Sequence, residues 1–368
     1  MENKLELGID LGSYFDEVAD NAKYYVDGKV IEPLSYFKDE NDVKYLRLRL
    51  WNDPYDENKR PYGAGTTDYN RVLKLAKIGK EKGYKLVLDF HYSDFWADPG
   101  KQTLPKKWAN LSFERLVEES ARFTKETLIN FKKEGISFVA IQIGNEITNG
   151  FMWPHGRLIE QEGKEARTNY DNFCTLMKEN IKAKNQIMPE ALTIIHLERS
   201  GDSKVYNEFF DQIVSHNIDF DIIGASYYPY WHGTFDQFFN NMTSLMKKYN
   251  KKVWVMEFAY AFTSDDYLKT DNNQMITRDE KMYFPYPLSK EGQEECIVTF
   301  LNRAKKENIG AIFYWEPCWL PKEHTYWATV EGQKYIHEEG KSTRNEWSNQ
   351  CLFDYDGNAL PGLFKFKA

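Results

Sequence analysis

The feature of this sequence that most limits its fold is a regular alternation of short apolar runs with longer amphipathic segments. The apolar runs are rich in β-branched and aromatic residues, a composition that is typical of buried strands. We expect eight such strands, at residues 5–12, 43–51, 84–93, 138–147, 191–199, 220–230, 252–260 and 311–317. Strands that alternate with helices favour a parallel sheet, because each parallel connection needs a crossover.

Two of the intervals between the strands carry clear helix signals. The segment 67–83 offers Thr67 or Asp68 as an N-cap and stops at Gly83, with apolar residues at helical spacing between them. The segment 112–135 shows the same pattern. Eight βα repeats in a chain of 368 residues favour a single α/β domain over residues 1–368, a closed (β/α)8 TIM barrel.

An open, doubly wound sheet is the alternative architecture, but it usually has a glycine-rich turn after its first strand, and "DLGSYFDE" is not such a turn. We also find no linker or repeat that would divide the barrel. The predicted βα loops are long at 52–67, 94–111, 148–169 and 261–290, so we expect an elaborate functional face.

Charge and hydrophobicity exclude several classes of partner. The net charge is −8 and no basic stripe is present, which argues against nucleic acid. No apolar run has the length of a membrane helix or of a signal peptide, so we expect no membrane partner and a cytoplasmic protein, or a secreted one whose leader was trimmed. The oligomeric state is unknown. The four cysteines lack metal-like spacing and are expected to be reduced and structural.

Polar residues end the predicted strands, and in a barrel these ends converge on one site. Glu146 follows Asn145 at the end of the fourth strand, and Glu257 ends the seventh. Two such carboxylates are what glycosidic-bond cleavage needs, one held protonated and one ionised, with one pKa raised and one depressed. A separation near 5 Å would indicate retention of configuration, and about 6.5 Å or more would indicate inversion.

Other strand-end residues suit supporting roles. Arg47 and Arg49 share one face of the second strand, and we prefer Arg49 as the cation beside the nucleophile because it lies nearer the strand end. Arg47 is instead a candidate ion-pair partner of Asp89. Tyr228 could donate to the same carboxylate, and Asn145 could hold a sugar 2-hydroxyl.

Metal and serine-based catalysis find less support in the sequence. None of the seven histidines forms HExxH or another compact ligand set, and no GxSxG elbow is present. Aromatic residues make up 16% of the chain, with 10 Trp, which suits stacking on sugar rings.

Five stretches carry a family resemblance: "RLRLWNDPY", "LDFHYSDFWADPGKQ", "WANLSFE", "VAIQIGNEITNGFMWPHG" and "ASYYPYWHGT". They closely resemble motifs of family 53 of the glycoside hydrolases, the arabinogalactan endo-β-1,4-galactanases of clan A. The resemblance implies a retaining enzyme in which Glu146 is the acid/base and Glu257 the nucleophile. It also matches Tyr228 and Trp315 to the clan's strand-6 tyrosine and strand-8 tryptophan, and implies β-1,4-galactan or galacto-oligosaccharides as the substrate.

The remaining site predictions concern substrate and metal. The candidate substrate-binding residues are Asp89, His91, Trp96, Trp153, Trp231, His232 and Trp319. We expect no cofactor in catalysis; a structural calcium ion, which the resemblance suggests for the loop after strand 7, is left open at residues 264–274. Two alternatives stay open: a clan A hydrolase of another β-1,4-glycan such as mannan or xylan, and a non-catalytic carbohydrate-binding barrel.

Overall fold

A computed structural model describes residues 4–159, 168–268 and 274–367 of the chain. All eight predicted strands are present, each slightly shorter than expected. They are β1 (Glu6–Asp10), β4 (Tyr45–Leu50), β5 (Lys85–Phe90), β6 (Ala140–Ile143), β9 (Leu192–Leu197), β10 (Ile222–Tyr227), β11 (Lys252–Phe258) and β12 (Ala311–Trp315). The strands close into one parallel barrel in chain order, with β12 beside β1, so the predicted (β/α)8 fold is confirmed.

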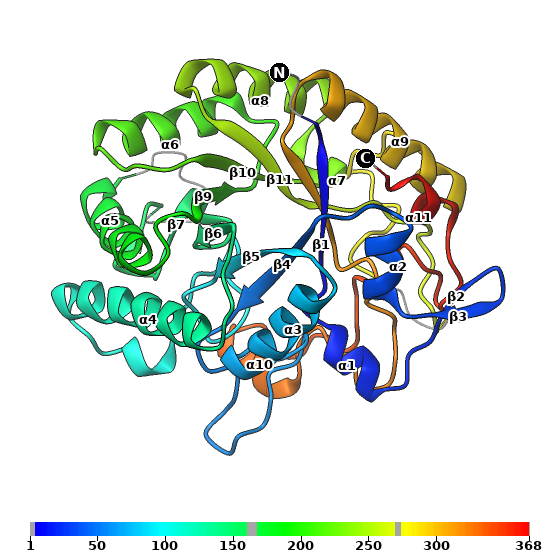
Figure 1. Cartoon of the computed structure of the whole chain (residues 1–368), viewed down its shortest axis with the longest axis horizontal. Helices are drawn as coiled ribbons and strands as arrows, with labels where there is room; N and C mark the ends of the chain where they lie inside the picture. The colour runs from blue at the N-terminus through cyan, green and yellow to red at the C-terminus, as the bar shows by residue number, and fades with distance from the viewer. Residues whose placement is uncertain (1–3, 160–167, 269–273, 368) are drawn as a thin grey trace.

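Helices surround the barrel (Figure 1). The main crossover helices are α3 (Tyr69–Glu81), α4 (Phe113–Lys133), α5 (Tyr170–Ile187), α6 (Ser203–Ser215), α8 (Phe235–Tyr249) and α9 (Lys290–Lys306). The shorter helices are α1 (Tyr14–Ala19), α2 (Pro33–Asp39), α7 (Pro229–His232), α10 (Val330–Tyr335) and α11 (Pro361–Lys365). None of the helices in the described ranges is long and apolar enough to cross a bilayer.

Local sequence explains where the two predicted helices begin. Asp68, rather than Thr67, caps α3 by accepting the backbone N–H of Arg71, and Ser112 caps α4 in the same way. Gly83, just beyond α3, has a φ of +78°, a left-handed conformation that glycine adopts without the steric penalty of a side chain.

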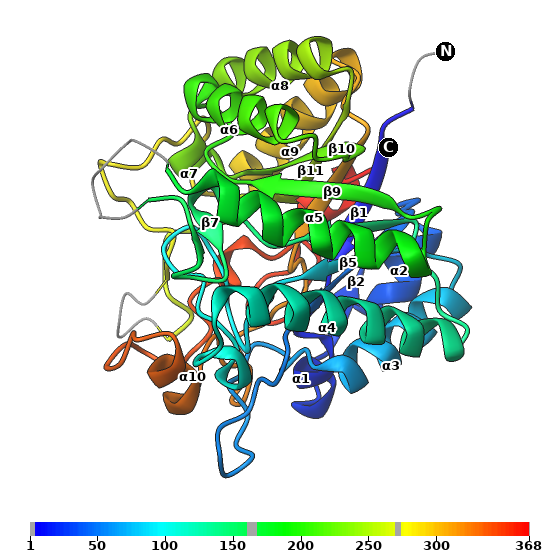
Figure 2. The same ribbon diagram turned by 90° about the vertical axis from the view of Figure 1, so that its left-hand side faces the viewer.

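Two small antiparallel hairpins were not predicted from the sequence. One pairs β2 (Tyr24–Val26) with β3 (Lys29–Ile31), and the other pairs β7 (Gly150–Phe151) with β8 (Gly156–Arg157) inside the loop that follows β6. Their strands are too short to give a periodic signal. In Figure 2, β7, α7 and α10 lie on the side of the barrel away from the N-terminus, which is the side where the strands end.

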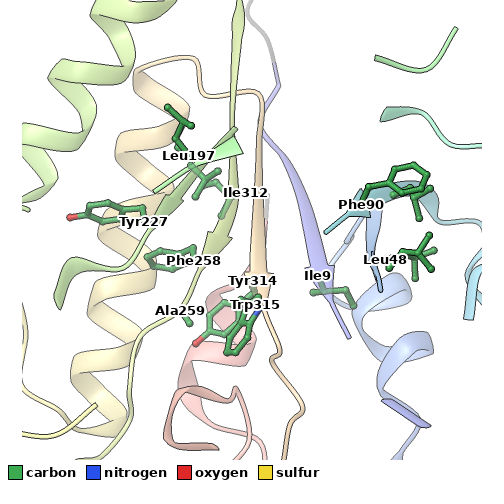
Figure 3. Close-up of a cluster of buried hydrophobic side chains, with 14 of the residues drawn as sticks. Ile9, Leu48, Phe90, Leu197, Tyr227, Phe258, Ala259, Ile312, Tyr314 and Trp315 are labelled. Atoms are coloured by element: carbon green, nitrogen blue, oxygen red, sulfur yellow. The ribbon is translucent and has the colours of Figure 1, made fainter. Parts of the chain in front are cut away.

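Side chains of the barrel strands alternate between two environments. Outward-facing residues such as Leu48, Phe90 and Tyr227 pack in the main hydrophobic core (Figure 3). A second set of buried strand residues forms a separate apolar cluster made of Tyr45, Val87, Ala140, Ile194, Ile222, Trp254, Met256, Ala311 and Phe313. Because strand side chains have a period of two, the next inward-facing residues lie one layer nearer the strand ends.

This next layer is polar and is the floor of the functional site. It includes Arg47, Asp89, Gln142, His196 and Ser226, all of which are almost completely buried. The first four each follow a residue of the apolar cluster by two positions, and Ser226 follows Ile222 by four. Burying so many polar groups is stable only when they are hydrogen-bonded to one another. The fold therefore places a network of hydrogen-bonded polar side chains directly above the apolar cluster inside the barrel.

Candidate active site

Glu257 occupies the end of β11 and receives two hydrogen bonds. Arg47 Nη1 donates to its Oε1 at 2.9 Å, and Tyr228 Oη donates to its Oε2 at 3.0 Å. Burial raises the pKa of the Glu257 carboxyl, and the Arg47 guanidinium opposes that rise. We expected the pKa of this carboxylate to be depressed; that expectation is wrong because the desolvation of this buried group outweighs its cation.

The preference for Arg49 as the cation beside Glu257 is also wrong. Arg49 Nη2 lies 3.0 Å from Glu316 Oε1, and its guanidinium stacks on Trp96 at 4.4 Å from the ring centroid. Arg47 does form the predicted ion pair with Asp89, at 2.9 Å, but the same guanidinium also reaches Glu257. One side chain thus joins the floor of the barrel to the end of β11.

Glu146 emerges directly after Asn145 in a left-handed conformation, with φ of +48° and ψ of +55°. Positive φ is uncommon for a residue with a side chain and often marks a functional turn. Burial raises the pKa of the Glu146 carboxyl well above its ordinary range, and the nearby carboxylates of Glu257 and Glu198 raise it further. Burial and these two carboxylates therefore all favour the protonated form of Glu146.

The two carboxyl groups face each other across the barrel. One oxygen of Glu146 and one of Glu257 lie within 4.8 Å of each other. This separation agrees with the spacing of about 5 Å that is typical of retaining glycosidases, whereas inverting enzymes need about 6.5 Å or more for a water molecule. The structure therefore pairs two glutamates that are 111 residues apart in the sequence.

Asn145 belongs to the polar floor. Its Oδ1 accepts from Arg47 Nη2 at 3.0 Å and its Nδ2 donates to the carbonyl of Ala97 at 2.9 Å. These contacts fix which end of the amide is the oxygen. The second N–H of the Asn145 amide has no hydrogen-bond partner among the described residues and is available to a ligand.

A cleft of about 380 Å³ opens above these groups. Among the predicted residues it is lined by Arg49, His91, Trp96, Asn145, Glu146, Tyr228, Trp231, His232, Glu257 and Trp315. Trp231 is 44% exposed, whereas Trp315 is only 8% exposed. The aromatic side chains thus lie beside the two carboxyl groups, as an arrangement for binding sugar rings requires.

Three predicted substrate-binding residues lie elsewhere. Asp89 is completely buried beneath the cleft, where it pairs with Arg47 and His91. Trp319 is 1% exposed and packs against Trp96 and Trp315, so it supports the wall from behind. Trp153 lines a separate hollow, where the Arg157 guanidinium covers its ring at 4.3 Å. The side-chain types of these residues are suited to sugar binding, but their positions are not. Asp89 lies too deep in the barrel, and the conformations of their loops place Trp153 and Trp319 outside the cleft.

Several site residues were missed from the sequence. Asp10 ends β1 and accepts from Arg47 Nη1 at 3.0 Å. Gln142 lies in β6, His196 lies in β9, and Glu198 directly follows β9. A polar residue inside an otherwise apolar strand, as in "AIQI" and "LTIIHL", is the signal that would have found Gln142 and His196.

The predicted calcium loop, residues 264–274, lies partly outside the described residues. Within its described part, Asp266 Oδ2 is 3.2 Å from Arg344 Nη2. The one cluster of three ligand-type side chains found in the described ranges is Glu146, His196 and Glu257, which is the carboxyl pair itself with a buried imidazole. All four cysteines are free and buried, as expected.

Comparison with known proteins gives a consistent result. The family model described as Glycosyl hydrolase family 53 matches residues 6–366. The chain is 32% identical to the endo-β-1,4-galactanase of Bacillus subtilis (strain 168) over 88% of this chain and 76% of that protein. It is 31% identical to a probable arabinogalactan endo-β-1,4-galactanase A of Neosartorya fischeri over 85% and 84%. A solved Ignisphaera aggregans GH53 catalytic domain superposes with a TM-score of 0.86 at 37% identity, covering 100% of this chain and 96% of that one.

Proposed function

Because the chain belongs to glycosyl hydrolase family 53, we propose that it hydrolyses β-1,4-galactosidic bonds in galactan or type I arabinogalactan side chains, and in their oligosaccharides, with retention of configuration. The observation that carries this proposal is the pair of carboxyl groups with oxygens within 4.8 Å of each other. The names of the relatives, which are galactanases, support galactan as the substrate.

In the first step of the proposed reaction, Glu257 attacks the anomeric carbon while Glu146 gives its proton to the departing glycosidic oxygen. This forms a covalent galactosyl ester with Glu257 and releases the leaving part of the chain. In the second step Glu146, now ionised, takes a proton from water as the water attacks the same carbon and releases Glu257. Carboxylates and water supply all of this chemistry, so no cofactor is required.

The surroundings of the two glutamates support these different roles. Arg47 and Tyr228 both donate to Glu257, which favours the ionised form that a nucleophile needs. No cation contacts Glu146 among the described residues, and nearby carboxylates favour its protonated form. The free N–H of Asn145 is a candidate donor to the sugar 2-hydroxyl, a contact that strengthens in the transition state.

The experiment that tests the substrate is chromatography of early products from linear β-1,4-galactan, with β-mannan and xylan in parallel. A ladder of galacto-oligosaccharides supports endo cleavage of galactan, and a single short product supports a cleft closed at one end. Products from mannan or xylan alone would assign another β-1,4-glycan. Absence of products from any polymer or short oligosaccharide would favour the carbohydrate-binding alternative.

The experiment that tests the stereochemistry is proton NMR of the first products. Retention gives the β-anomer before mutarotation. An initial α-anomer would overturn the double displacement. Glu257→Ala is expected to abolish turnover while leaving the fold intact. The compartment in which the enzyme acts and the calcium ion stay predictions.

A further inference from the structure

Ser226 connects Glu146 to a buried histidine. Ser226 Oγ lies 2.6 Å from Glu146 Oε1 and 2.9 Å from His196 Nε2. Ser226 and His196 are completely buried, and Ser226 is the one hydrogen-bond partner of the Glu146 carboxyl among the described residues. The serine hydroxyl has a single hydrogen, so it can donate to one of these neighbours and must accept from the other.

The direction of the two hydrogen bonds depends on the tautomer of His196. Burial lowers the pKa of His196 well below its ordinary value, and the positive charge of Arg47 lowers it further, so the ring is neutral and has one N–H. If Nε2 carries that hydrogen, it donates to Ser226, and Ser226 donates to Glu146. If Nδ1 carries it, Ser226 donates to the ring, and Glu146 must donate its own proton to Ser226.

The neighbours of Nδ1 decide between these two orders. Gln142 Nε2, a donor, lies 3.1 Å from His196 Nδ1, and Asn145 Oδ1, an acceptor, lies 3.0 Å from it. Asn145 Oδ1 already accepts from Arg47, a charged donor, which lessens its need for a hydrogen from the ring. Gln142 Nε2 carries two hydrogens: one goes to Asp89 Oδ1 at 2.6 Å, and the other lies within reach of His196 Nδ1 and of the carbonyl of Gly144. When that second hydrogen goes to His196, the order runs from Gln142 to His196 to Ser226 to Glu146, and Nε2 is the protonated nitrogen of the ring.

We propose that Ser226, oriented by the Nε2–H tautomer of His196, is a positioning residue that reserves Oε1 of Glu146 as an acceptor and assigns Oε2 as the oxygen that carries the transferred proton. The proposal rests on the proposed role of Glu146 as acid/base. Oε2 has no hydrogen-bond partner among the described residues, and Glu146 lines the cleft. In the reverse order, the proton of Glu146 would be held on Oε1, facing Ser226 rather than the glycosidic oxygen.

The kinetic test replaces Ser226 by Ala and uses Ser200→Ala as the matched control. Ser200 is equally buried, and its Oγ donates to the backbone carbonyl of Ser226 at 2.7 Å. The Ser200→Ala substitution therefore removes a similar hydrogen bond from the same region without changing a contact of Glu146. Ser226→Ala is expected to lower kcat/KM on galactan about 10- to 100-fold, the scale of one hydrogen bond to a charged group. Ser200→Ala is expected to change it less than about 3-fold.

Two readouts separate positioning from simple loss of structure. On an aryl β-galactobioside with a very good leaving group, kcat/KM reports a step that needs no proton, so Ser226→Ala is expected to match the wild type there. In a Glu146→Ala background, Ser226→Ala is expected to cause no further loss on galactan. Equal losses on both substrates, or a full additional loss in the double variant, would overturn the proposal.

The tautomer itself is measured by ¹⁵N NMR of the histidine side chains, with the His196 signals assigned by their absence in His196→Gln. A protonated Nε2 and a bare Nδ1 are expected, and a protonated Nδ1 would overturn the proposed order. His196→Gln retains a donor at the Nε2 position and is expected to keep more activity than His196→Leu. If the wild type does not hydrolyse galactan, the proposed function fails. If it does, and Ser226→Ala behaves like Ser200→Ala, only the proposed positioning role of Ser226 fails.

Discussion

Arg47 and Glu257 form the ion pair at the centre of the site, with 2.9 Å between Nη1 and Oε1. The same guanidinium pairs with Asp10 at 3.0 Å and Asp89 at 2.9 Å, so it is shared among three buried carboxylates. A shared cation fixes the position of Glu257 more firmly than a dedicated pair would, because none of the three partners can move independently.

Replacing Arg47 by Lys is therefore expected to lower kcat/KM on galactan by about 100-fold, because an ammonium group cannot reach all three carboxylates in the geometry of a guanidinium. Arg47 opposes the rise in the pKa of Glu257. Weakening the ion pair between residue 47 and Glu257 raises the pKa of Glu257 further. The acidic limb of the pH profile, where the nucleophile becomes protonated, is therefore expected to shift to higher pH.

The matched control for that change is Arg49→Lys, which alters a guanidinium two residues further along the same strand that pairs with Glu316 instead. We expect this variant to lose thermal stability with little movement of the acidic limb. A shift of the limb in Arg49→Lys but not in Arg47→Lys would contradict the assignment.

The fold was predictable because strands buried on both faces must be apolar almost throughout, and those runs are visible in the sequence. The glutamate pair was predictable for a related reason. Placing a carboxylate at the end of a buried strand costs free energy of desolvation, so its presence there indicates a function. Arg47 and Arg49 could not be separated, because both point inward and only the stagger of the barrel decides which one reaches the end of β11. The alternation of side chains along a strand shows which residues point into the barrel, but it does not show how far along the barrel axis each one lies.

Loop residues were less predictable for a different reason. Trp96, Trp153 and Trp319 all follow strands and have the same chemistry, yet only Trp96 lines the cleft. The position of each ring depends on the conformation of its loop, and loop conformation is set by contacts with other loops rather than by local propensity. Trp319, for example, is 1% exposed and packs against Trp96, which comes from the loop after β5.

The role of Glu146 predicts a dependence on the leaving group. Glu146→Gln is expected to reduce kcat/KM on galactan by about 10² to 10⁴, since it removes the proton that the departing oxygen needs. On an aryl galactoside with a very good leaving group, the first step is expected to proceed at nearly the wild-type rate. A comparable loss on both substrates would remove Glu146 from the acid role.

The raised pKa of Glu146 also predicts a change in stability with pH. The unfolded pKa of Glu is about 4.3, and the folded pKa is higher, so folding is penalised as pH rises from about 4.3 through the folded pKa. Glu146→Gln stays neutral and avoids this penalty. We expect its melting temperature to equal that of the wild type near pH 4 and to exceed it by about 1–3 °C at pH 8.

Differential scanning calorimetry across this pH range measures the effect. Glu118→Gln is a suitable control, because Glu118 is exposed on α4 and pairs with Arg115 at the surface. It is expected to leave the pH dependence unchanged. A Glu146→Gln variant that is less stable than the wild type at pH 8 would contradict the direction of the pKa shift.

Chelation tests the loop at residues 264–274. We expect EDTA to leave the melting temperature within about 1 °C of its original value, because a protein that holds no structural metal gains no binding free energy from one. Melting in EDTA with and without added calcium measures this. A large drop that calcium reverses would place a structural calcium ion in the protein.

Trp231 and Trp153 offer a matched pair for testing the extent of the cleft. Trp231 is partly exposed and lines the catalytic cleft, whereas Trp153 is partly exposed in the separate hollow. Loss of one aromatic platform removes about 0.5–1.5 kcal/mol of ring stacking, so Trp231→Ala is expected to raise KM for galactotetraose by about 2- to 10-fold. Trp153→Ala is expected to change it less than about 2-fold. Initial-rate kinetics on a single defined oligosaccharide give both values, and an equal rise in the two variants would mean that bound sugar extends from the cleft into the hollow beside Trp153.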